Sequence, residues 1–547
     1  MKRKLTTKIL AFTLLITCVV GCCFFLTSCS NSVSTTFDNT YKPPVYNTSG
    51  QEKNAVIILP GIMGSNLVNA ETGVSVWSGG GLMNNLFMSN TATDKEGRFI
   101  TSEIKKYLKS FLYKDEKGNS VIPLRAATMN DKALEYGLID EYKNLYNFFE
   151  KNLGSKSGLE KDKQYEVVVY QYDWTNSCVT SAEQLEQFIK ANKYTNNILV
   201  GHSMGGTVID YYLARNEENR TSTQKVITLG TPHFGAVDAA ILSISDIELN
   251  LSDKTIDTFN KVITGKITDQ SEIMSGIDSK DITTLLDLLG LLLNKKVGLS
   301  DIGEIMDMVG GLGSVDTSMI LDVLPKEYVN NPIGFVMDIL STTISYLRTM
   351  PSVYELLPTK QAFEKGFNGE KPITIDGKTV TYDEYISAIK ELDYVKNNAY
   401  IKQIVDGLNE KQNSLVIDGK FVTDLVDTHY IAGNGYTDTT TTYSVNLAKK
   451  DGKLVLKPSV DNIKRLKSYT SELNNSYGDG MVLVESATAG KTEKVHVLKG
   501  YFDHIDLYSP ESIKPGSHFL PIFIENEIGT TIRQEILGDI IKELSKK

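Results

Sequence analysis

Cysteine is almost absent from most of this 547-residue chain. Four of its five cysteines lie within the first 29 positions, and only Cys178 lies beyond them. The main body therefore cannot form an intrachain disulfide, and we expect Cys178 to be a small buried residue and not a nucleophile. Histidine is also scarce, with six residues in all. No group of His, Cys, Asp and Glu has metal-ligand spacing, so the sequence predicts no metal site and no cofactor.

Positive charge is in short supply as well. Lys and Arg number 57 against 67 Asp and Glu, and four of the basic residues lie within the first eight positions. This excess of acid argues against nucleic acid as a partner, and against attraction to an anionic bilayer by charge alone. Any membrane contact beyond an anchor should therefore be apolar.

The first 28 residues have the pattern of an export signal. A basic start is followed by an apolar run over residues 9–26 and then by Leu-Thr-Ser-Cys at 26–29. This ending resembles the bacterial lipobox, whose cysteine is diacylated and becomes the first mature residue. We therefore predict lipidation of Cys29 and anchoring to the outer face of a bacterial cell membrane, since two acyl chains hold a protein stably. Lipidation at Cys22 and an uncleaved transmembrane helix are the alternatives.

Short apolar runs alternate with helical segments from residue 54 onward. Six runs are expected to form strands: residues 54–59, 165–170, 197–201, 225–229, 427–432 and 495–498. This alternation predicts an α/β fold with a mostly parallel sheet and helices on both faces. The threonine-rich stretch at 437–442 is expected to be a loop, and residues 449–457 suggest a hairpin.

The chain beyond the signal divides into a tether and one large domain. Residues 29–53 are rich in Ser, Thr, Asn and Pro without periodicity, which predicts a flexible tether. Residues 54–547 are too many for one simple core, so we expect a single domain with large insertions. Residues 237–347 consist mainly of helical apolar runs, which predicts a helical cap over the C-terminal edge of the sheet, where open α/β folds bind ligands.

Residues 201–205, Gly-His-Ser-Met-Gly, join the expected strand at 197–201 to a helix. A sharp strand-to-helix turn strains its central residue, and glycine on both sides removes Cβ atoms that would collide. The Ser203 hydroxyl would then stand at the sheet edge, at the positive end of the helix. The pattern predicts that Ser203 is a nucleophile, with an ordinary turn serine as the alternative.

A serine nucleophile needs a base, and the base needs an orienting acid. Among the histidines, His504 alone lies in a loop after the last expected strand, downstream of the glycine-flanked Asp479. The order Ser203, Asp479, His504 is that of α/β-hydrolases. Asp427 is a weaker rival for the acid, and His202 inside the turn is expected to face away from the hydroxyl.

The expected strand at 54–59 ends in the glycine-rich turn Pro-Gly-Ile-Met-Gly-Ser at 60–65. Such a turn can direct backbone N–H groups at a developing oxyanion, and this hydrolase architecture takes a second N–H from the residue after the nucleophile. The two amides would be those of Ile62 and Met204. An ordinary loop is the alternative interpretation.

Five stretches taken in order resemble the lecithin:cholesterol acyltransferase-like family of α/β-hydrolases. They are Leu-Pro-Gly-Ile-Met-Gly-Ser (59–65), Tyr-Asp-Trp (172–174), Gly-His-Ser-Met-Gly-Gly (201–206), Met-Pro-Ser-Val-Tyr-Glu-Leu-Leu-Pro (350–358) and Gly-Asp-Gly-Met-Val (478–482). The resemblance implies an α/β-hydrolase fold with a helical cap and a lipid acyl-ester substrate. By the same resemblance Ser203 attacks the acyl carbonyl, His504 takes its proton and later activates the acceptor, and Asp479 holds the imidazole.

The implied function is that of a membrane-anchored serine acyl hydrolase or O-acyltransferase. Water or an alcohol could accept the acyl group, depending on what the pocket admits. The alternative is a catalytically inactive surface lipoprotein whose cap binds lipid or a partner. Two features depart from the family, since Thr175 stands where arginine commonly follows Tyr-Asp-Trp and the cap lacks cysteine. The acceptor, the head group, the acyl length and the oligomeric state are left open.

Overall fold

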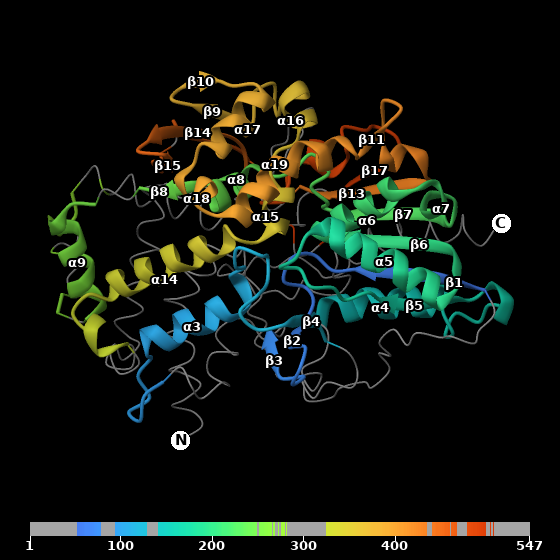
Figure 1. The fold of residues 1–547 in the computed structure, drawn as a ribbon, viewed down its shortest axis with the longest axis horizontal. Helices are drawn as coiled ribbons and strands as arrows, with labels where there is room; N and C mark the ends of the chain where they lie inside the picture. Colours follow the sequence, from blue (N-terminus) through green and yellow to red (C-terminus); the bar gives the residue numbers. More distant parts are fainter. Residues whose placement is uncertain are drawn as a thin grey trace.

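The computed structural model describes the part of the chain that holds the sheet and the helices around it (Figure 1). The described residues are 52–77, 93–127, 140–248, most of 251–281, 324–434, 440–459, 461–467, 478–498, 504 and 507. The expected export signal, the lipidation site Cys29, nearly all of the tether and the middle of the cap lie outside them.

Six parallel strands form the central sheet, in the order β17-β13-β7-β6-β1-β5. All six correspond to predicted strands, and the predicted α/β class is confirmed. Their bounds are β1 Lys53–Leu59, β5 Tyr165–Val169, β6 Tyr194–His202, β7 Thr223–Leu229, β13 Thr428–Gly433 and β17 Val495–Leu498.

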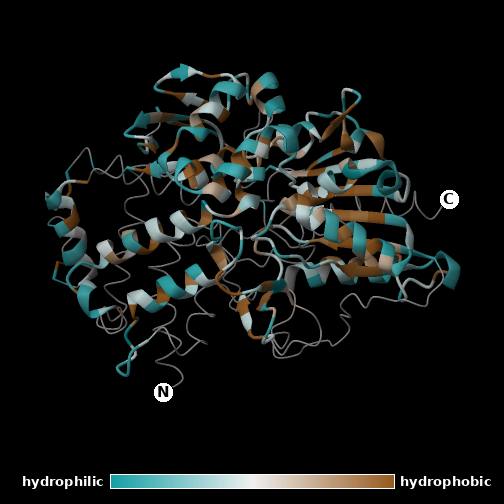
Figure 2. Cartoon of the chain, in the orientation of Figure 1, coloured by the Kyte–Doolittle hydropathy of each residue, from teal (hydrophilic) through white to brown (hydrophobic). Residues whose placement is uncertain are grey.

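Helices cover both faces of this sheet because its strands are apolar on both sides. On β1, Ala55, Ile57 and Leu59 pack in one core cluster, while Val56 and Ile58 pack in another. The first cluster includes α5 (Cys178–Asn192) and α6 (Met204–Arg215), and the second includes α4 (Asp140–Asn152). Figure 2 shows the central strands coloured as hydrophobic between these more polar helices.

A second, smaller sheet lies beside the first, and the sequence predicted only the hairpin at 449–457 within it. Its order is β10-β9-β14-β15-β8, and β16 also pairs with β14. The bounds are β8 Ser245–Ile247, β9 Ile373–Ile375, β10 Lys378–Thr379, β14 Thr440–Lys450, β15 Lys453–Leu456 and β16 Ile463–Lys467. The loop expected at 437–442 is therefore wrong from Thr440 onward, because these β-branched threonines are buried in β14. The expected hairpin is present as β14 and β15.

The described part of residues 237–347 contains α8 (Val237–Ile244), α9 (Asp253–Ile263) and α14 (Pro332–Leu347), together with β8. An earlier segment joins them, since α3 (Thr101–Leu112) packs along α14. Lys105 Nζ and Asp338 Oδ1 lie 2.6 Å apart between these two helices. Figure 1 shows both extending away from the sheet with α9 at their far end.

The remaining elements are short. A three-stranded antiparallel sheet contains β2 Leu67–Asn69, β3 Ser75–Trp77 and β4 Leu124–Ala126, and a hairpin contains β11 Val416–Ile417 and β12 Lys420–Phe421. The remaining helices are α7 Glu217–Thr221, α15 Pro351–Glu355, α16 Lys360–Lys365, α17 Tyr382–Lys390, α18 Asp393–Lys396, α19 Ala399–Asn413 and α20 Val484–Ala487. Single 3₁₀ turns occupy Lys161–Lys163, Lys326–Tyr328 and Val422–Leu425. Within the described ranges, every helix is too short or too polar to cross a bilayer.

Candidate active site

The turn between β6 and α6 holds Ser203 in a strained conformation, with φ 50° and ψ −126°. The glycines around it are required by close backbone contacts. A Cβ on Gly201 would lie 2.6 Å from Gly206 Cα, and one on Gly205 would lie 2.2 Å from the Leu59 carbonyl oxygen. The sequence therefore bends sharply here because glycine lets α6 press against β6 and β1.

Three side chains from distant segments meet at this turn. The Ser203 hydroxyl lies 2.8 Å from His504 Nε2, and His504 Nδ1 lies 2.9 Å from Asp479 Oδ2. The second Asp479 oxygen accepts the backbone N–H groups of Met481 at 3.1 Å and Val482 at 2.8 Å. A carboxylate held this way accepts Nδ1–H, which leaves Nε2 of His504 free to accept the serine proton.

These three side chains are largely shielded from water. Ser203 is 7 % exposed, Asp479 1 % and His504 5 %. Gly230, at the end of β7, makes room for the pair, since a Cβ there would lie 3.0 Å from Asp479 Oδ2 and 3.1 Å from His504 Nδ1. Gly230 also has φ +57°, which favours glycine. Gly230 was not predicted to belong to the site, although it directly follows a predicted strand.

The rival acid, Asp427, lies at the other end of the sheet. Its carboxylate pairs with Lys225 Nζ at 2.6 Å and also with Lys494. Burial opposes its ionisation, but the two lysines outweigh burial and lower its pKa to about 2. Asp427 is therefore a partner of lysines, and it does not contact His504.

The glycine-rich loop lies directly against the nucleophile. A Cβ on Gly61 would be 3.0 Å from Ser203 Cβ. Met204 is the first residue of α6, so its N–H points out of the helix end, and Met63 holds the loop with φ 64°. Within the described ranges, neither Ile62 nor Met204 donates its N–H to an acceptor. Their assignment to an oxyanion hole remains a prediction that this arrangement allows.

Both tryptophans of the chain hold this loop. Trp77 Nε1 donates to the Met63 carbonyl at 2.9 Å, and Trp174 Nε1 donates to the Ser65 carbonyl at 3.1 Å. The two indoles meet edge to face with centroids 5.5 Å apart. The loop is thus held by side chains, which is how a preorganised donor site is kept rigid. The Tyr-Asp-Trp stretch at 172–174 was visible in the sequence, but its contact with the loop was not predicted.

Comparison with known proteins identifies this region. The family model described as lecithin:cholesterol acyltransferase matches residues 89–265, which include the turn and Ser203. Residues 89–265 are therefore similar to a lecithin:cholesterol acyltransferase family domain. The resemblance seen in the sequence is thereby confirmed, and the family domain implies a lipid acyl hydrolase or acyltransferase with lipid acyl esters as substrates.

Solved structures are also similar to this chain. The crystal structure of a Tle4–Tli4 complex shares 12 % identity, covers 90 % of this chain and 98 % of its own, and has a TM-score of 0.44. No curated protein matches the chain in sequence.

A buried lysine lies beside Thr175, the position at which this chain departs from the family pattern. Lys114, which is only 3 % exposed, donates from Nζ to Thr175 Oγ1 at 2.8 Å and to Ser120 Oγ at 2.6 Å, and lies 4.0 Å from Asp173. Burial lowers the pKa of Lys114, and the Asp173 carboxylate opposes this effect. A lysine side chain from the segment after α3 therefore lies beside the position where the family commonly has arginine.

Cys178 is a buried structural residue, as the sequence predicted. It is 1 % exposed, and burial raises the pKa of its thiol well above the ordinary value. Its backbone N–H donates to buried Glu355 at 2.6 Å, and Glu355 also accepts Ser177 Oγ at 2.6 Å and Lys411 Nζ at 2.7 Å. The glutamate of the Met-Pro-Ser-Val-Tyr-Glu stretch thus holds the start of α5.

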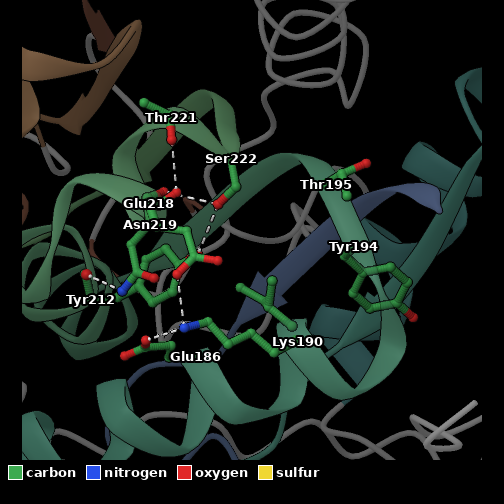
Figure 3. Close-up of a pocket in the computed structure, with 10 residues that line it drawn as sticks. Glu186, Lys190, Tyr194, Thr195, Tyr212, Glu218, Asn219, Thr221 and Ser222 are labelled. Carbon is green, nitrogen blue, oxygen red and sulfur yellow. Dashed lines mark hydrogen bonds and ion pairs between the residues drawn. The ribbon is translucent and has the colours of Figure 1, made fainter. Parts of the chain in front are cut away.

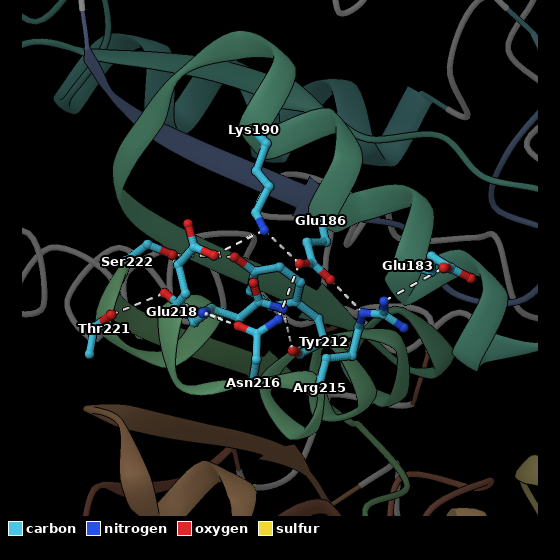
Figure 4. Close-up of polar contacts among 10 residues, drawn as sticks. Glu183, Glu186, Lys190, Tyr212, Arg215, Asn216, Glu218, Thr221 and Ser222 are labelled. Carbon is cyan, nitrogen blue, oxygen red and sulfur yellow. Dashed lines mark hydrogen bonds and ion pairs between the residues drawn. The ribbon is translucent and has the colours of Figure 1, made fainter.

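A pocket of about 300 Å³ lies at the N-terminal end of β6, opposite the end that carries Ser203 (Figure 3). Glu186 in its wall pairs with Lys190 at 2.8 Å and with Arg215 at 2.5 Å, and Lys190 also pairs with Glu218 at 3.0 Å (Figure 4). Burial opposes ionisation of Glu186, but these cations lower its pKa to about 2. Its charged groups are engaged with one another, so we do not assign a function to this pocket.

Among the described residues, no group of His, Cys, Asp and Glu could hold a metal ion.

Proposed function

We propose that this protein is a serine acyl hydrolase or O-acyltransferase that acts on lipid acyl esters through Ser203, His504 and Asp479. The observation that carries the proposal is the continuous hydrogen-bonded series from the Ser203 hydroxyl through His504 to Asp479, at a strained turn. Ser203 lies within the residues that match the lecithin:cholesterol acyltransferase family model, and this match supports lipid acyl esters as the substrate class.

The geometry supports a two-step mechanism. His504 Nε2 accepts the Ser203 proton as the oxygen attacks the acyl carbonyl, and Asp479 stabilises the imidazolium that forms. The amides of Ile62 and Met204 stabilise the oxyanion. The lipid alcohol leaves with the proton from His504, and Ser203 keeps the acyl group. His504 then activates water or an acceptor alcohol, which takes the acyl group and restores the serine.

The first test is labelling with a fluorophosphonate probe, which reacts with an activated serine. We expect the unmodified protein to be labelled and Ser203→Ala to be unlabelled, with ester hydrolysis reduced about 10⁴-fold or more because the nucleophile is lost. Ser345→Ala, at an exposed serine of α14, is the matched control and should behave as the unmodified protein.

Two outcomes would count against the proposal. Labelling that persists in Ser203→Ala would assign the nucleophile elsewhere. An unmodified protein that is neither labelled nor active on any lipid ester would favour the inactive surface lipoprotein. Product lipids from mixed membranes, with and without an added sterol or alcohol, would distinguish transfer from hydrolysis.

A further inference from the structure

A second hydrogen-bonded series runs behind the first. The Gly61 N–H donates to Tyr142 Oη at 2.8 Å, Tyr142 Oη lies 2.7 Å from His202 Nδ1, and His202 Nε2 lies 3.0 Å from the carbonyl oxygen of His504. Both side chains are buried, Tyr142 with 2 % exposed and His202 with 5 %. We call this series the tyrosine–histidine link.

The chemistry of its two ends determines the direction of every bond. A backbone N–H only donates, so Tyr142 Oη accepts from Gly61 and has its own proton to give. A carbonyl oxygen only accepts, so His202 must carry its proton on Nε2. The bare Nδ1 of that neutral ring then accepts the Tyr142 proton. The two ring nitrogens of His202 therefore bond to Tyr142 and to the His504 carbonyl oxygen.

The link joins four segments that are far apart in the chain. Gly61 belongs to the glycine-rich loop beside Ser203, and His202 directly precedes the nucleophile. His202 and His504 are 302 positions apart, and the bond between them holds the backbone of the base. Tyr142, from α4, connects the loop to the turn. The relative position of nucleophile, oxyanion loop and base thus depends on two side chains that touch no reacting atom.

We infer that Tyr142 and His202 are positioning residues, which hold the oxyanion loop and His504 in register with Ser203 during acyl transfer. The inference rests on the proposed function. It also requires His202 to stay neutral, because its ring centroid lies 5.0 Å from that of His504. A cation at that distance would oppose proton uptake by His504. Burial, together with the nearby His504, lowers the pKa of His202 well below its ordinary value, in agreement with this requirement.

The first experiment removes one hydroxyl. We expect Tyr142→Phe to lower kcat about 10- to 100-fold with KM changed less than about threefold, because a misplaced oxyanion loop costs transition-state stabilisation more than ground-state binding. Tyr165→Phe is the matched control. It removes a hydroxyl that donates to Gln224 at 2.6 Å, at the far end of the sheet from Ser203. If the Tyr142 hydroxyl had only a structural role, Tyr142→Phe and Tyr165→Phe would both have a lower Tm, and their kcat values would be the same.

The second experiment divides the link at its histidine. Asn at position 202 can accept near the place of Nδ1, and Gln can donate near the place of Nε2. We expect His202→Asn and His202→Gln each to keep part of kcat, and His202→Ala to lose about 100-fold. A folded His202→Ala protein with unchanged kcat would overturn the inference.

A third measurement does not depend on activity. In protein with ¹⁵N-labelled histidine, the His202 signal, assigned with His202→Gln, should show a proton on Nε2 and no titration through the usual histidine range. A proton on Nδ1, or a charged ring near neutral pH, would overturn the inference. If the tautomer is as expected but the unmodified protein is inactive, the proposed function fails and the inferred role in catalysis fails with it, while the link remains as structure.

Discussion

Two buried histidines of this protein each contact an aspartate, but they have different roles. The difference depends on the hydroxyl group that each histidine faces. His233 Nδ1 lies 2.7 Å from Asp210 Oδ2, much as His504 lies against Asp479, and both members of this pair are buried. His233, however, faces Thr228 Oγ1 at 3.4 Å on a regular strand. A His–Asp pair alone therefore does not make a site. The hydroxyl must also sit on a strained turn beside free amides.

A further pair, His429 and His496, stacks near the N-terminal edge of the sheet, away from Ser203. The rings lie 5.6 Å apart and nearly parallel, and His429 Nε2 accepts from Lys225 Nζ at 3.1 Å. Burial and Lys225 lower the pKa of His429 to about 4, although Asp427 opposes them. His496 and Lys494 act in the same direction as burial.

This pair predicts a loss of stability on acidification. Between about pH 6.5 and about pH 4 the unfolded chain binds a proton that folded His429 does not, so the free energy of unfolding falls as the pH falls. The His429→Gln variant keeps an acceptor for Lys225. We expect its free energy of unfolding, measured with urea, to fall by roughly 2 kcal/mol less over this pH window than that of the unmodified protein. Equal slopes for the two proteins would contradict the assignment.

At the scale of elements, the turn at Ser203 depends on the contact of α6 with the end of β1. A Cβ on Gly205 would lie 2.2 Å from the Leu59 carbonyl oxygen and 2.6 Å from that of Pro60. Both atoms belong to the backbone and cannot move aside alone. Any larger residue must therefore push α6 away from β1 or displace the loop that follows β1.

We predict that Gly205→Ala lowers the free energy of unfolding by about 2 to 3 kcal/mol and reduces ester hydrolysis at least tenfold, because the crowded atoms lead into the oxyanion loop. Chemical unfolding and ester hydrolysis would measure the two effects.

Gly407→Ala, inside α19, is the control for the same substitution. A Cβ there meets nothing within 4 Å, so alanine should stabilise the protein by about 0.5 to 1 kcal/mol without changing activity. Equal effects of the two substitutions would show that backbone crowding at Gly205 is unimportant.

At the scale of the whole molecule, the chain combines an acidic body with an apolar start. Net charge is −10, and the basic residues of the first eight positions belong to the expected signal. Such a body gains little from charge at an anionic membrane. Attachment would then depend on the lipid chains proposed at Cys29, and the proposed lipid substrate would lie in the same membrane.

This proposal predicts the effect of one substitution. Cys29→Ser should move the protein from the membrane fraction to the soluble fraction and abolish incorporation of a labelled fatty acid, because no acyl chain remains to anchor it. Cys22→Ser is the control and should stay in the membrane fraction. Retention of Cys29→Ser in the membrane fraction would favour an uncleaved transmembrane segment.

Contiguous patterns were enough to predict the main elements and to propose candidate site residues. Glycines on both sides of Ser203, the alternation of apolar runs, and the glycine-flanked Asp479 each express local chemistry, in which a turn or a strand depends on neighbouring residues. The order of Ser203, Asp479 and His504 along the chain could also be recognised from the sequence. Thr440–Lys450 could not be recognised as a strand, because its polar residues are buried only by pairing with distant segments.

Contacts between distant segments depend on the tertiary structure and could not be predicted from the sequence. Whether Asp479 or Asp427 contacts His504 depends on which end of the sheet each carboxylate occupies, and no local pattern records that position. Tyr142 carries no motif, yet it joins two parts of the site. Strand order and helix packing bring such residues together, and these depend on burial of apolar surface across the whole chain, which is a property of the assembled core and not of any one stretch.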